Sequence, residues 1–207
     1  MNLYFDTEFT GLHKDTTLIS IGIVSDDERS FYAEFTDYDK SQCDDWIKEN
    51  VVKKLRFETP KADEEYHYIA SREPFNQIGY DLYCGYSVEM NGNKDNISDE
   101  LRRWLKQFHE IQFVSDVCHF DFVLLIDLFG CAFDIPQNVS PCCHDINQDI
   151  ANSLGITEDT AFDLSREDLI KKLYQEYPET MIDVHKHNAL YDAMVIQLIY
   201  RAIKTMG

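Results

Sequence analysis

Apolar residues alternate with polar ones along the first part of the chain, and this is the pattern of β-strands. Leu3-Tyr4-Phe5 opens one strand, and residues 17–24 (TLISIGIV) carry isoleucine at every second position, which predicts a second strand with one apolar face. Asp26-Asp27 supplies a turn, and residues 30–35 predict a strand that returns beside the second. We therefore expect a strand meander at the start of the chain.

Helical patterns follow from residue 41 onward. Ser41 and Ser98 are placed to cap helices, and Gly130 is placed to end one. A short apolar strand is expected at residues 111–114. The expected helices span residues 41–55, 98–108, 120–129, 143–155, 165–177 and 188–204. Strands first, and then helices that alternate with strands, predict an α/β protein with a mixed sheet.

Residues 56–96 have the least regular pattern of the chain. They combine a charged segment that starts at Pro60, expected to be helical, with a tyrosine-rich stretch and an Asn91-Gly92-Asn93 turn. We interpret about residues 57–96 as an insertion at the edge of the core. The chain is otherwise expected to form a single domain over residues 1–207.

The composition indicates an acidic chain that can fold. Of 207 residues, 38 are acidic and 19 basic, so the net charge is −19, while 44% are hydrophobic. That apolar share argues against disorder, and no apolar run reaches the length of a membrane span. The N-terminus has no basic region before an apolar stretch, so we expect a cytoplasmic protein with no membrane partner. The acidic balance opposes nucleic-acid binding, unless carboxylates gather divalent cations that present positive charge locally.

The six cysteines include no Cys-x-x-Cys pair. Cys142, Cys143 and His144 are adjacent and suggest zinc, but tetrahedral zinc sites usually need two spaced pairs of ligands. Reduced thiols are therefore the preferred interpretation of the cysteines, and a zinc site at this tripeptide is the alternative.

A pair of acids continues the first strand. Asp6 and Glu8 follow Leu3-Tyr4-Phe5, and a spacing of two on a strand aims both carboxylates at one side. A central strand that offers two acids to one face is costly unless a cation binds them. The alternative is that the strand has already ended and that both acids are solvated.

Two further acids lie on apolar helix faces. Asp192 shares a face of the last expected helix with isoleucines four, seven and eleven residues later. Asp121 shares a face of the 120–129 helix with two leucines. Each acid by itself has an alternative role as a hydrogen-bonded structural residue or a helix cap. Four such acids in one chain favour a functional site.

The ligand types indicate the metal and the chemistry. Four carboxylates without a thiolate pattern select Mg²⁺ or Mn²⁺ over zinc or copper. Two such ions about 4 Å apart form the clamp used for in-line phosphodiester cleavage. His187, five residues before Asp192, is placed to act as the general base of such a site. The alternative for His187 is a surface residue without a role.

Motifs at both ends of the chain give these residues a family resemblance. Residues 5–12 (FDTEFTGL) match an Asp-x-Glu followed by Thr-Gly-Leu, and residues 187–193 (HNALYDA) match a His-x-Ala-x-x-Asp. The chain thus resembles the DEDDh 3′→5′ exonuclease superfamily. This resemblance implies a ribonuclease H-like fold, in which helices flank a mixed five-stranded sheet. Many members have His-Asn where this chain has Asp116 and Val117, so substrate contacts made there are not carried over.

A closer resemblance is to the RNase AS-like exoribonucleases, which degrade adenylate-containing RNA from the 3′ end. It rests on the opening LYFDTEF, the LISIGIV strand and Asp183-Val184-His185, and it leaves about residues 57–96 outside. It also offers His185 as a second candidate for the general base, because His185 belongs to the Asp-Val-His sequence shared with this family. His187, in contrast, keeps the five-residue spacing to Asp192. We favour His187.

The resemblance implies a role for each residue of the expected site. Asp6 bridges two Mg²⁺ or Mn²⁺ ions, and Glu8 and Asp192 complete the site of the nucleophilic water. Asp121 supports the second ion, directly or through water. His187 deprotonates the water, and the products are nucleoside 5′-monophosphates.

The expected partner is the 3′ end of single-stranded RNA, and a homodimer is expected. The residues expected to contact substrate are Phe9, Thr10, Gly11 and Leu12. The candidate phosphate contacts are Lys53, Lys54 and Arg56, or Arg102, Arg103 and Lys106. The net charge of −19 predicts weak, metal-dependent and salt-sensitive binding of long RNA. The alternatives are an oligoribonuclease-like enzyme, a DNA-trimming relative, or an inactive exonuclease-like interaction module.

Overall fold

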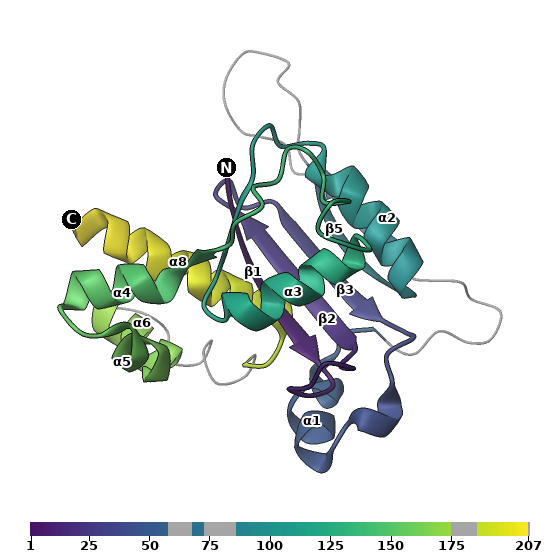
Figure 1. The fold of residues 1–207 in the computed structure, drawn as a ribbon, viewed down its shortest axis with the longest axis horizontal. Coiled ribbons are helices and arrows are strands. Elements are labelled where there is room, and N and C mark those ends of the chain that lie inside the picture. The colour runs from purple at the N-terminus through teal and green to yellow at the C-terminus, as the bar shows by residue number, and fades with distance from the viewer. Residues whose placement is uncertain (58–67, 73–85, 175–185, 207) are drawn as a thin grey trace.

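A mixed sheet forms the centre of the protein (Figure 1). The computed structural model describes residues 1–57, 68–72, 86–174 and 186–206, and within these ranges the strand order is β4-β5-β3-β2-β1-β6-β7. β2 pairs antiparallel with β1 and β3, whereas β6 runs parallel to β1 and β5 parallel to β3. The strands are β1 Asn2–Phe9, β2 Leu18–Ser25, β3 Ser30–Phe35, β4 Tyr68–Arg72, β5 Tyr86–Gly92, β6 Gln112–Ser115 and β7 His144–Asp145.

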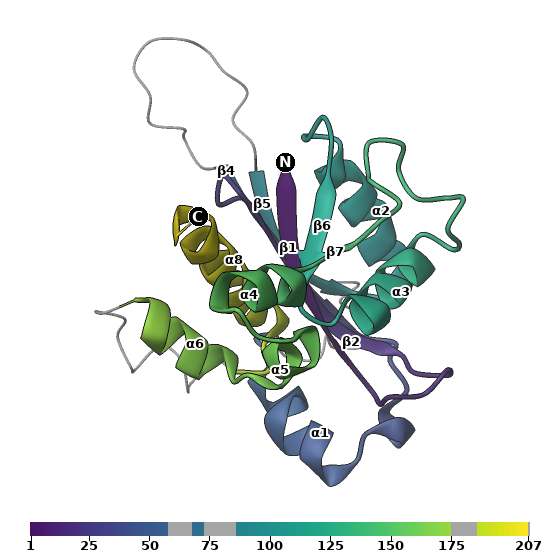
Figure 2. The same cartoon turned by 60° about the vertical axis from the view of Figure 1, so that its left-hand side comes forward.

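Helices cover both faces of this sheet. Figure 2 shows α2 and α3 on one side and α4 and α8 on the other. The alternation of β1 explains both contacts, because Phe5 belongs to the core under α2 and α3, while Tyr4 packs with Ile196 of α8. None of the helices in the described ranges is long and apolar enough to cross a membrane. The helices are η1 Lys40–Gln42, α1 Asp45–Asn50, η2 Val52–Lys54, α2 Lys94–Leu105, α3 Cys118–Leu128, α4 Ile146–Leu154, α5 Glu158–Asp163, α6 Arg166–Leu173 and α8 Ala189–Met206.

The expected α/β fold class, a ribonuclease H-like mixed sheet flanked by helices, is confirmed, but the expected count of five strands is wrong. The described residues form seven. Two of them, β4 and β5, come from the segment interpreted as an insertion, and they extend the sheet beyond β3. The charged segment at Pro60 and most of the tyrosine-rich stretch lie outside the described residues.

Several expected caps and turns are wrong. Asn91 and Gly92 end β5 instead of forming a turn, because Asn93 caps α2 by accepting a hydrogen bond from the backbone of Asn96 at 2.9 Å. Ser98 therefore lies inside α2. Likewise, Asp44 rather than Ser41 caps α1. Helix α5 was not expected at all. Asn, Asp, Ser and Thr all make good caps, so composition alone does not select among neighbours.

Gly22 brings the start of α8 against the sheet. Gly22 lies opposite Asp6 in the β1–β2 register. A Cβ atom at this position would lie 2.1 Å from the backbone nitrogen of Leu190 and 2.3 Å from the carbonyl carbon of Ala189. The absence of a side chain here allows the first turn of α8, which carries Asp192, to sit directly over β1 and β2.

Candidate active site

The four acids predicted from the sequence and His187 line one cleft of about 480 Å³. The cleft opens where β1 and β6 separate, since their pairing ends at Tyr4 and Val114. Asp6 and Glu8 lie beyond that point but still within β1, so the alternative in which the strand ends before them is wrong. The strand continues without its β6 neighbour, and this leaves room for carboxylates and a ligand.

The first turn of α8 holds His187 at the edge of the cleft. The backbone N–H of His187 donates a hydrogen bond to Oδ2 of Asp192 at 2.9 Å. His187 has a φ of 63°, in the left-handed region that non-glycine residues seldom adopt. The hydrogen bond to Asp192 stabilises this turn, so the five-residue spacing noticed in the sequence has a structural cause.

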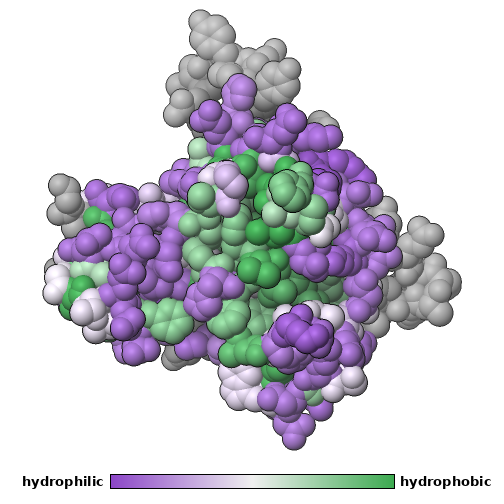
Figure 3. Space-filling model, in the orientation of Figure 1, coloured by the Kyte–Doolittle hydropathy of each residue, from purple (hydrophilic) through white to green (hydrophobic). Residues whose placement is uncertain are grey.

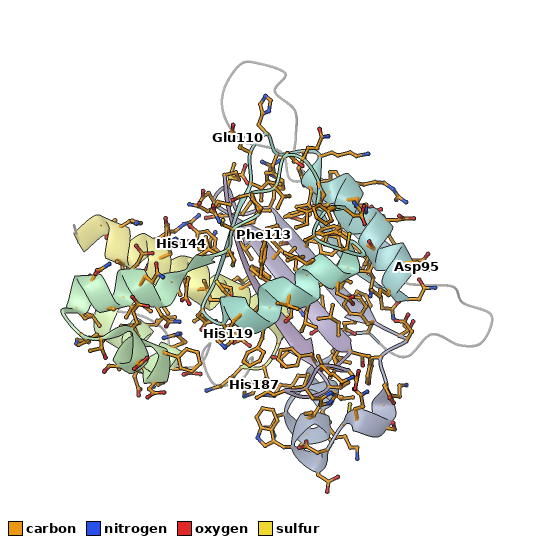
Figure 4. All side chains as sticks on the ribbon, in the orientation of Figure 1. Asp95, Glu110, Phe113, His119, His144 and His187 are labelled. Atoms are coloured by element: carbon orange, nitrogen blue, oxygen red, sulfur yellow. The ribbon has the colours of Figure 1, made fainter. Side chains whose placement is uncertain are left out.

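Glu8, His187 and Asp192 form one possible cation site, here named the Glu8 group. Their ligand atoms all lie within 4.8 Å of one another, and Nδ1 of His187 is 3.9 Å from Oε1 of Glu8. The ring of Trp46 on α1 meets the imidazole edge-on, with centroids 5.0 Å apart. Figure 4 shows His187 beside the end of β1, close to α1. The imidazole is therefore fixed by packing as well as by its backbone.

Asp6, Asp116 and Asp121 form a second possible cation site, here named the Asp6 group. Their ligand atoms also lie within 4.8 Å of one another. Asp121 is buried at the first turn of α3 and accepts hydrogen bonds from Thr7 Oγ1 at 2.6 Å and Ser115 Oγ at 2.7 Å. One hydroxyl binds each carboxylate oxygen, so the orientation of Asp121 is set by its neighbours.

Asp116 belongs to this site although its sequence context did not predict it. Arg166, the first residue of α6, donates from Nε to Oδ2 of Asp116 at 2.7 Å and from Nη2 to Oδ1 of Asn147 at 2.6 Å. Nη1 of the same guanidinium donates to the carbonyl of Ala161 at 3.0 Å. Asp116 is thus held in place by a well-bonded arginine. The signal in the sequence that could have indicated its role was the departure from the resembled superfamily, since Asp116 and Val117 stand where many members have His-Asn.

The carboxyl groups in the cleft have raised pKa values, because they are buried and close to one another. Burial, and next the charges of Asp121 and Asp192, raise the pKa of Asp6 well above its usual value. Burial raises the pKa of Glu8 to about 8, and the charges of Asp192 and Asp121 add to this shift. Burial likewise raises the pKa values of Asp121 and Asp192 to about 7. A cation in the cleft would relieve this repulsion and favour the ionised carboxylates.

The donor set fits magnesium or manganese. The two groups contain carboxylate oxygens and one imidazole, and hard divalent cations prefer oxygen ligands. Within the part of the chain that the structure describes, neither group includes a cysteine. Cys143 lies with its sulfur 2.9 Å from that of Cys118, and His144 bonds to Asp149, so the structure does not support the alternative zinc site at residues 142–144.

The pKa shifts predict how the stability of the metal-free protein changes with pH. The folded-state pKa values of Asp121 and Asp192, about 7, exceed the unfolded value of about 4. Between these two pKa values the folded state therefore binds more protons than the unfolded state. The contribution of these protons to the free energy of unfolding is fully present below about pH 4 and is lost as the pH rises through about 7. We expect the melting temperature in EDTA to fall between about pH 5 and about pH 8.5.

An Asp192→Asn variant is the control for that prediction. It lacks one of the titrating groups, so its melting temperature should fall less over the same pH range than that of the parent. A fall of equal size in the variant would show that general repulsion among the surface acids, and not the cleft, causes the effect.

The end of β1 and the loop that follows it contribute two different kinds of residue. Phe9 and Leu12 line the cleft, and Leu12 is 72% exposed. Thr10 is buried and accepts a hydrogen bond from the backbone of Thr17 at 2.9 Å, while the backbone of Gly11 donates to Thr16. Of the residues expected to contact substrate, Phe9 and Leu12 face the cleft, and Thr10 and Gly11 shape the loop.

The candidate phosphate contacts differ in their distance from the cleft. Lys54 donates to the carbonyl of Lys186 at 2.6 Å, beside His187. By contrast, Arg102 donates to the carbonyls of Phe129 and Asp134, and Arg103 pairs with Glu100. The side chains of Arg102 and Arg103 are therefore bonded away from the cleft. The second candidate base, residue 185, lies outside the described residues.

Comparison with known proteins points to nucleases over part of the chain. No protein-family model matches it. The chain is 38% identical over 55 residues to two 3′-5′ exoribonucleases of Mycobacterium tuberculosis, one from strain CDC 1551 / Oshkosh and one from strain H37Rv. The match covers 27% of this chain and 33% of each relative. The similarity is thus to part of a 3′-5′ exoribonuclease.

Proposed function

We propose that the protein is a metal-dependent 3′→5′ exoribonuclease that hydrolyses RNA from its 3′ end to nucleoside 5′-monophosphates. The observation that carries this proposal is the pairing of the Asp6 group and the Glu8 group in one cleft. Two clusters of oxygen ligands side by side suit the two-cation clamp of phosphodiester hydrolysis. The partial similarity to 3′-5′ exoribonucleases supports the same reaction.

The proposed metal ligands are Asp6, Glu8, Asp121 and Asp192, with Asp116 as a further oxygen donor in the Asp6 group. Two Mg²⁺ or Mn²⁺ ions bound there would supply positive charge to the scissile phosphate and lower the pKa of the attacking water. The chain itself fixes the ligands before substrate arrives. Hydrogen bonds from Thr7 and Ser115 hold Asp121, and a hydrogen bond from Arg166 holds Asp116. In the Glu8 group, the backbone of His187 donates to Asp192 and fixes these two residues relative to each other.

His187 is the proposed general base. Burial, and next the charges of Lys186 and Lys54, lower its pKa, so the imidazole is neutral and able to accept a proton near neutral pH. In the reaction, the oxygen of water forms a bond to phosphorus, the bond from phosphorus to the 3′ oxygen breaks, and the proton of the water passes to the imidazole. The shortened strand leaves with a 3′-hydroxyl, whose proton comes from solvent.

A His187→Ala variant should lower the turnover number by about a hundredfold or more, because a positioned proton acceptor contributes roughly 10²–10⁴-fold. The measurement is the single-turnover rate on a labelled RNA at saturating Mn²⁺. A His185→Ala variant is the matched control and should keep the parental rate. Loss of rate in His185→Ala with full rate in His187→Ala would assign the base to the other histidine.

The proposed substrate is single-stranded RNA whose terminal base packs on Phe9 and Leu12. A preference for adenylate is part of the proposal, and it is supported by the resemblance to adenylate-degrading enzymes. Choice of RNA over DNA would require a contact to the 2′-hydroxyl. We further propose that the enzyme works as a homodimer, which sedimentation equilibrium would test.

The product ladder on matched strands tests the function. Oligo(A) RNA and the same DNA sequence, both labelled at the 5′ end, are incubated with Mn²⁺, with and without chelator. We expect loss of single nucleotides from the 3′ end, faster on RNA, release of 5′-monophosphates, and no cleavage in chelator. Faster loss from DNA would indicate the DNA-trimming alternative, and cleavage confined to very short RNA would indicate the oligoribonuclease-like one. Absence of cleavage on both strands would overturn the proposal.

A further inference from the structure

Cys118 and Cys143 bring their sulfur atoms to 2.9 Å from each other, although they lie far apart in the chain. Cys118 is the first residue of α3, and Cys143 directly precedes β7. Both side chains are half-buried, and both carry free thiols. We infer that these two thiols form a redox-responsive pair, which a hydroperoxide converts into a disulfide that joins the start of α3 to β7.

The pairing of two strands holds the cysteines together. β7 runs parallel to β6, with His144 opposite Val114. Helix α3 begins at the third residue after β6 ends, so its first residue lies beside the start of β7. The sulfur of Cys118 also donates a hydrogen bond to the carbonyl of His144 at 3.3 Å. The contact between the two sulfurs therefore follows from the sheet, and not from a chance approach of two surface side chains.

The proposed oxidation has two steps. The sulfur of one thiol attacks the hydroperoxide and takes up one oxygen atom, which gives a sulfenic acid and releases water or an alcohol. The sulfur of the second thiol then bonds to the first sulfur, the bond from the first sulfur to oxygen breaks, and water leaves with the proton of the thiol. Because the second thiol is already in contact, the disulfide should form before further oxidation to a sulfinic acid.

The start of α3 is a place where an added bond changes stability. Val117, which precedes the helix, makes no side-chain capping bond, and such a bond is a common source of stability at helix starts. Val123 of α3 is 60% exposed, and Figure 3 shows apolar side chains gathered over this helix. The rest of the protein therefore covers α3 only in part. A disulfide would tie its first residue to the sheet and close residues 118–143 into a loop, which lowers the entropy of the unfolded chain.

The pair lies outside the candidate active-site cleft, which neither cysteine lines. It nevertheless joins two segments that support the Asp6 group. Asp121 follows Cys118 by three residues, and Asn147, just after β7, donates from Nδ2 to the carbonyl of Asp116 at 2.7 Å. The disulfide would thus strengthen the frame around the cleft without a contact to substrate.

Mass spectrometry of the oxidised protein tests this inference. The full chain is treated with hydrogen peroxide, the remaining thiols are blocked with N-ethylmaleimide, and the protein is cleaved before its aspartate residues without reduction. Cys118 then lies in the peptide 116–120 and Cys143 in the peptide 134–144, so the disulfide appears as these two peptides joined, with the loss of two hydrogen atoms. We expect the joined peptides as the main oxidised product, and dithiothreitol should separate them.

Oxidation should also raise the melting temperature by roughly 6–12 °C, as expected for a disulfide that closes a loop of this length. In Cys143→Ser, neither the joined peptides nor the rise should appear. Cys118→Ser removes the other sulfur and should give the same result, so the test does not depend on how well one variant folds. Cys142→Ser is the matched control, because Cys142 is the adjacent residue but is exposed, and it should keep both effects.

Three results would overturn the inference. The first is joined peptides that persist in Cys143→Ser. The second is a sulfinic or sulfonic acid at Cys118 in place of the disulfide, and the third is a melting temperature of the parent that peroxide leaves unchanged. These measurements use no nucleic acid, so their outcome is independent of the proposed nuclease activity.

Discussion

An Asp6→Asn variant is expected to lose at least about a thousandfold of the metal-dependent rate. Asp6 belongs to the Asp6 group, and charges from both groups, including those of Asp192 and Glu8, act on its carboxyl and raise its pKa. The substitution replaces one carboxylate oxygen by an amide nitrogen, which keeps the size of the side chain and removes a negative charge from the Asp6 group. The rate on labelled oligo(A) at saturating Mn²⁺ measures this effect.

The same variant should be more stable than the parent in EDTA near pH 8, because one charge leaves a crowded cluster. A lower rate together with a higher melting temperature separates a lost metal site from a damaged fold. Asp127→Asn is the matched control. Asp127 also lies on an apolar helix, but its side chain is 62% exposed and pairs with Lys94, so the variant should keep the parental rate and stability. Cleavage by Asp6→Asn at the parental rate would end the metal proposal.

A Gly22→Ala variant should lower the free energy of unfolding by about 3 kcal/mol, which corresponds to a fall in melting temperature of roughly 6–12 °C for a chain of this size. The new Cβ would lie 2.1 Å from the backbone nitrogen of Leu190. Backbone atoms of a helix cannot rotate away as a side chain can, so α8 has to shift. Because α8 carries Asp192, we expect the rate of the folded variant to fall as well.

Gly155→Ala provides the comparison for this effect. Gly155 has a φ of 66°, and a Cβ there would meet nothing within 4 Å, so the cost is backbone strain of about 1 kcal/mol. The rate should stay at the parental value, since Gly155 ends α4 away from the carboxylates. Thermal melts and rates of both variants decide the matter. Equal losses in the two would contradict the role of Gly22 as the contact that seats α8.

Much of the fold could be predicted from local patterns in the sequence. Alternation along β1, β2 and β3 places apolar side chains on the sheet faces whatever the rest of the chain does, and so these strands were predictable. The start of α1 was not, because Ser41 and Asp44 are both good caps and the path of the chain selects between them. Strands β4 and β5, which extend the sheet beyond β3, were missed for a related reason, since the propensity to form a strand depends on the neighbours that the strand packs against.

The sequence by itself determined that Asp6 and Glu8 share one side of a strand and that Asp192 lies on the apolar face of a helix that follows His187, because these relations follow from the geometry of a single element. Only the tertiary structure decided that Asp116 joins Asp6 and Asp121 and that Arg166 holds Asp116 in place. These contacts connect segments far apart in the chain. Their positions depend on how the helices pack on the sheet, and this packing cannot be predicted from the periodicity of apolar residues within one helix or strand.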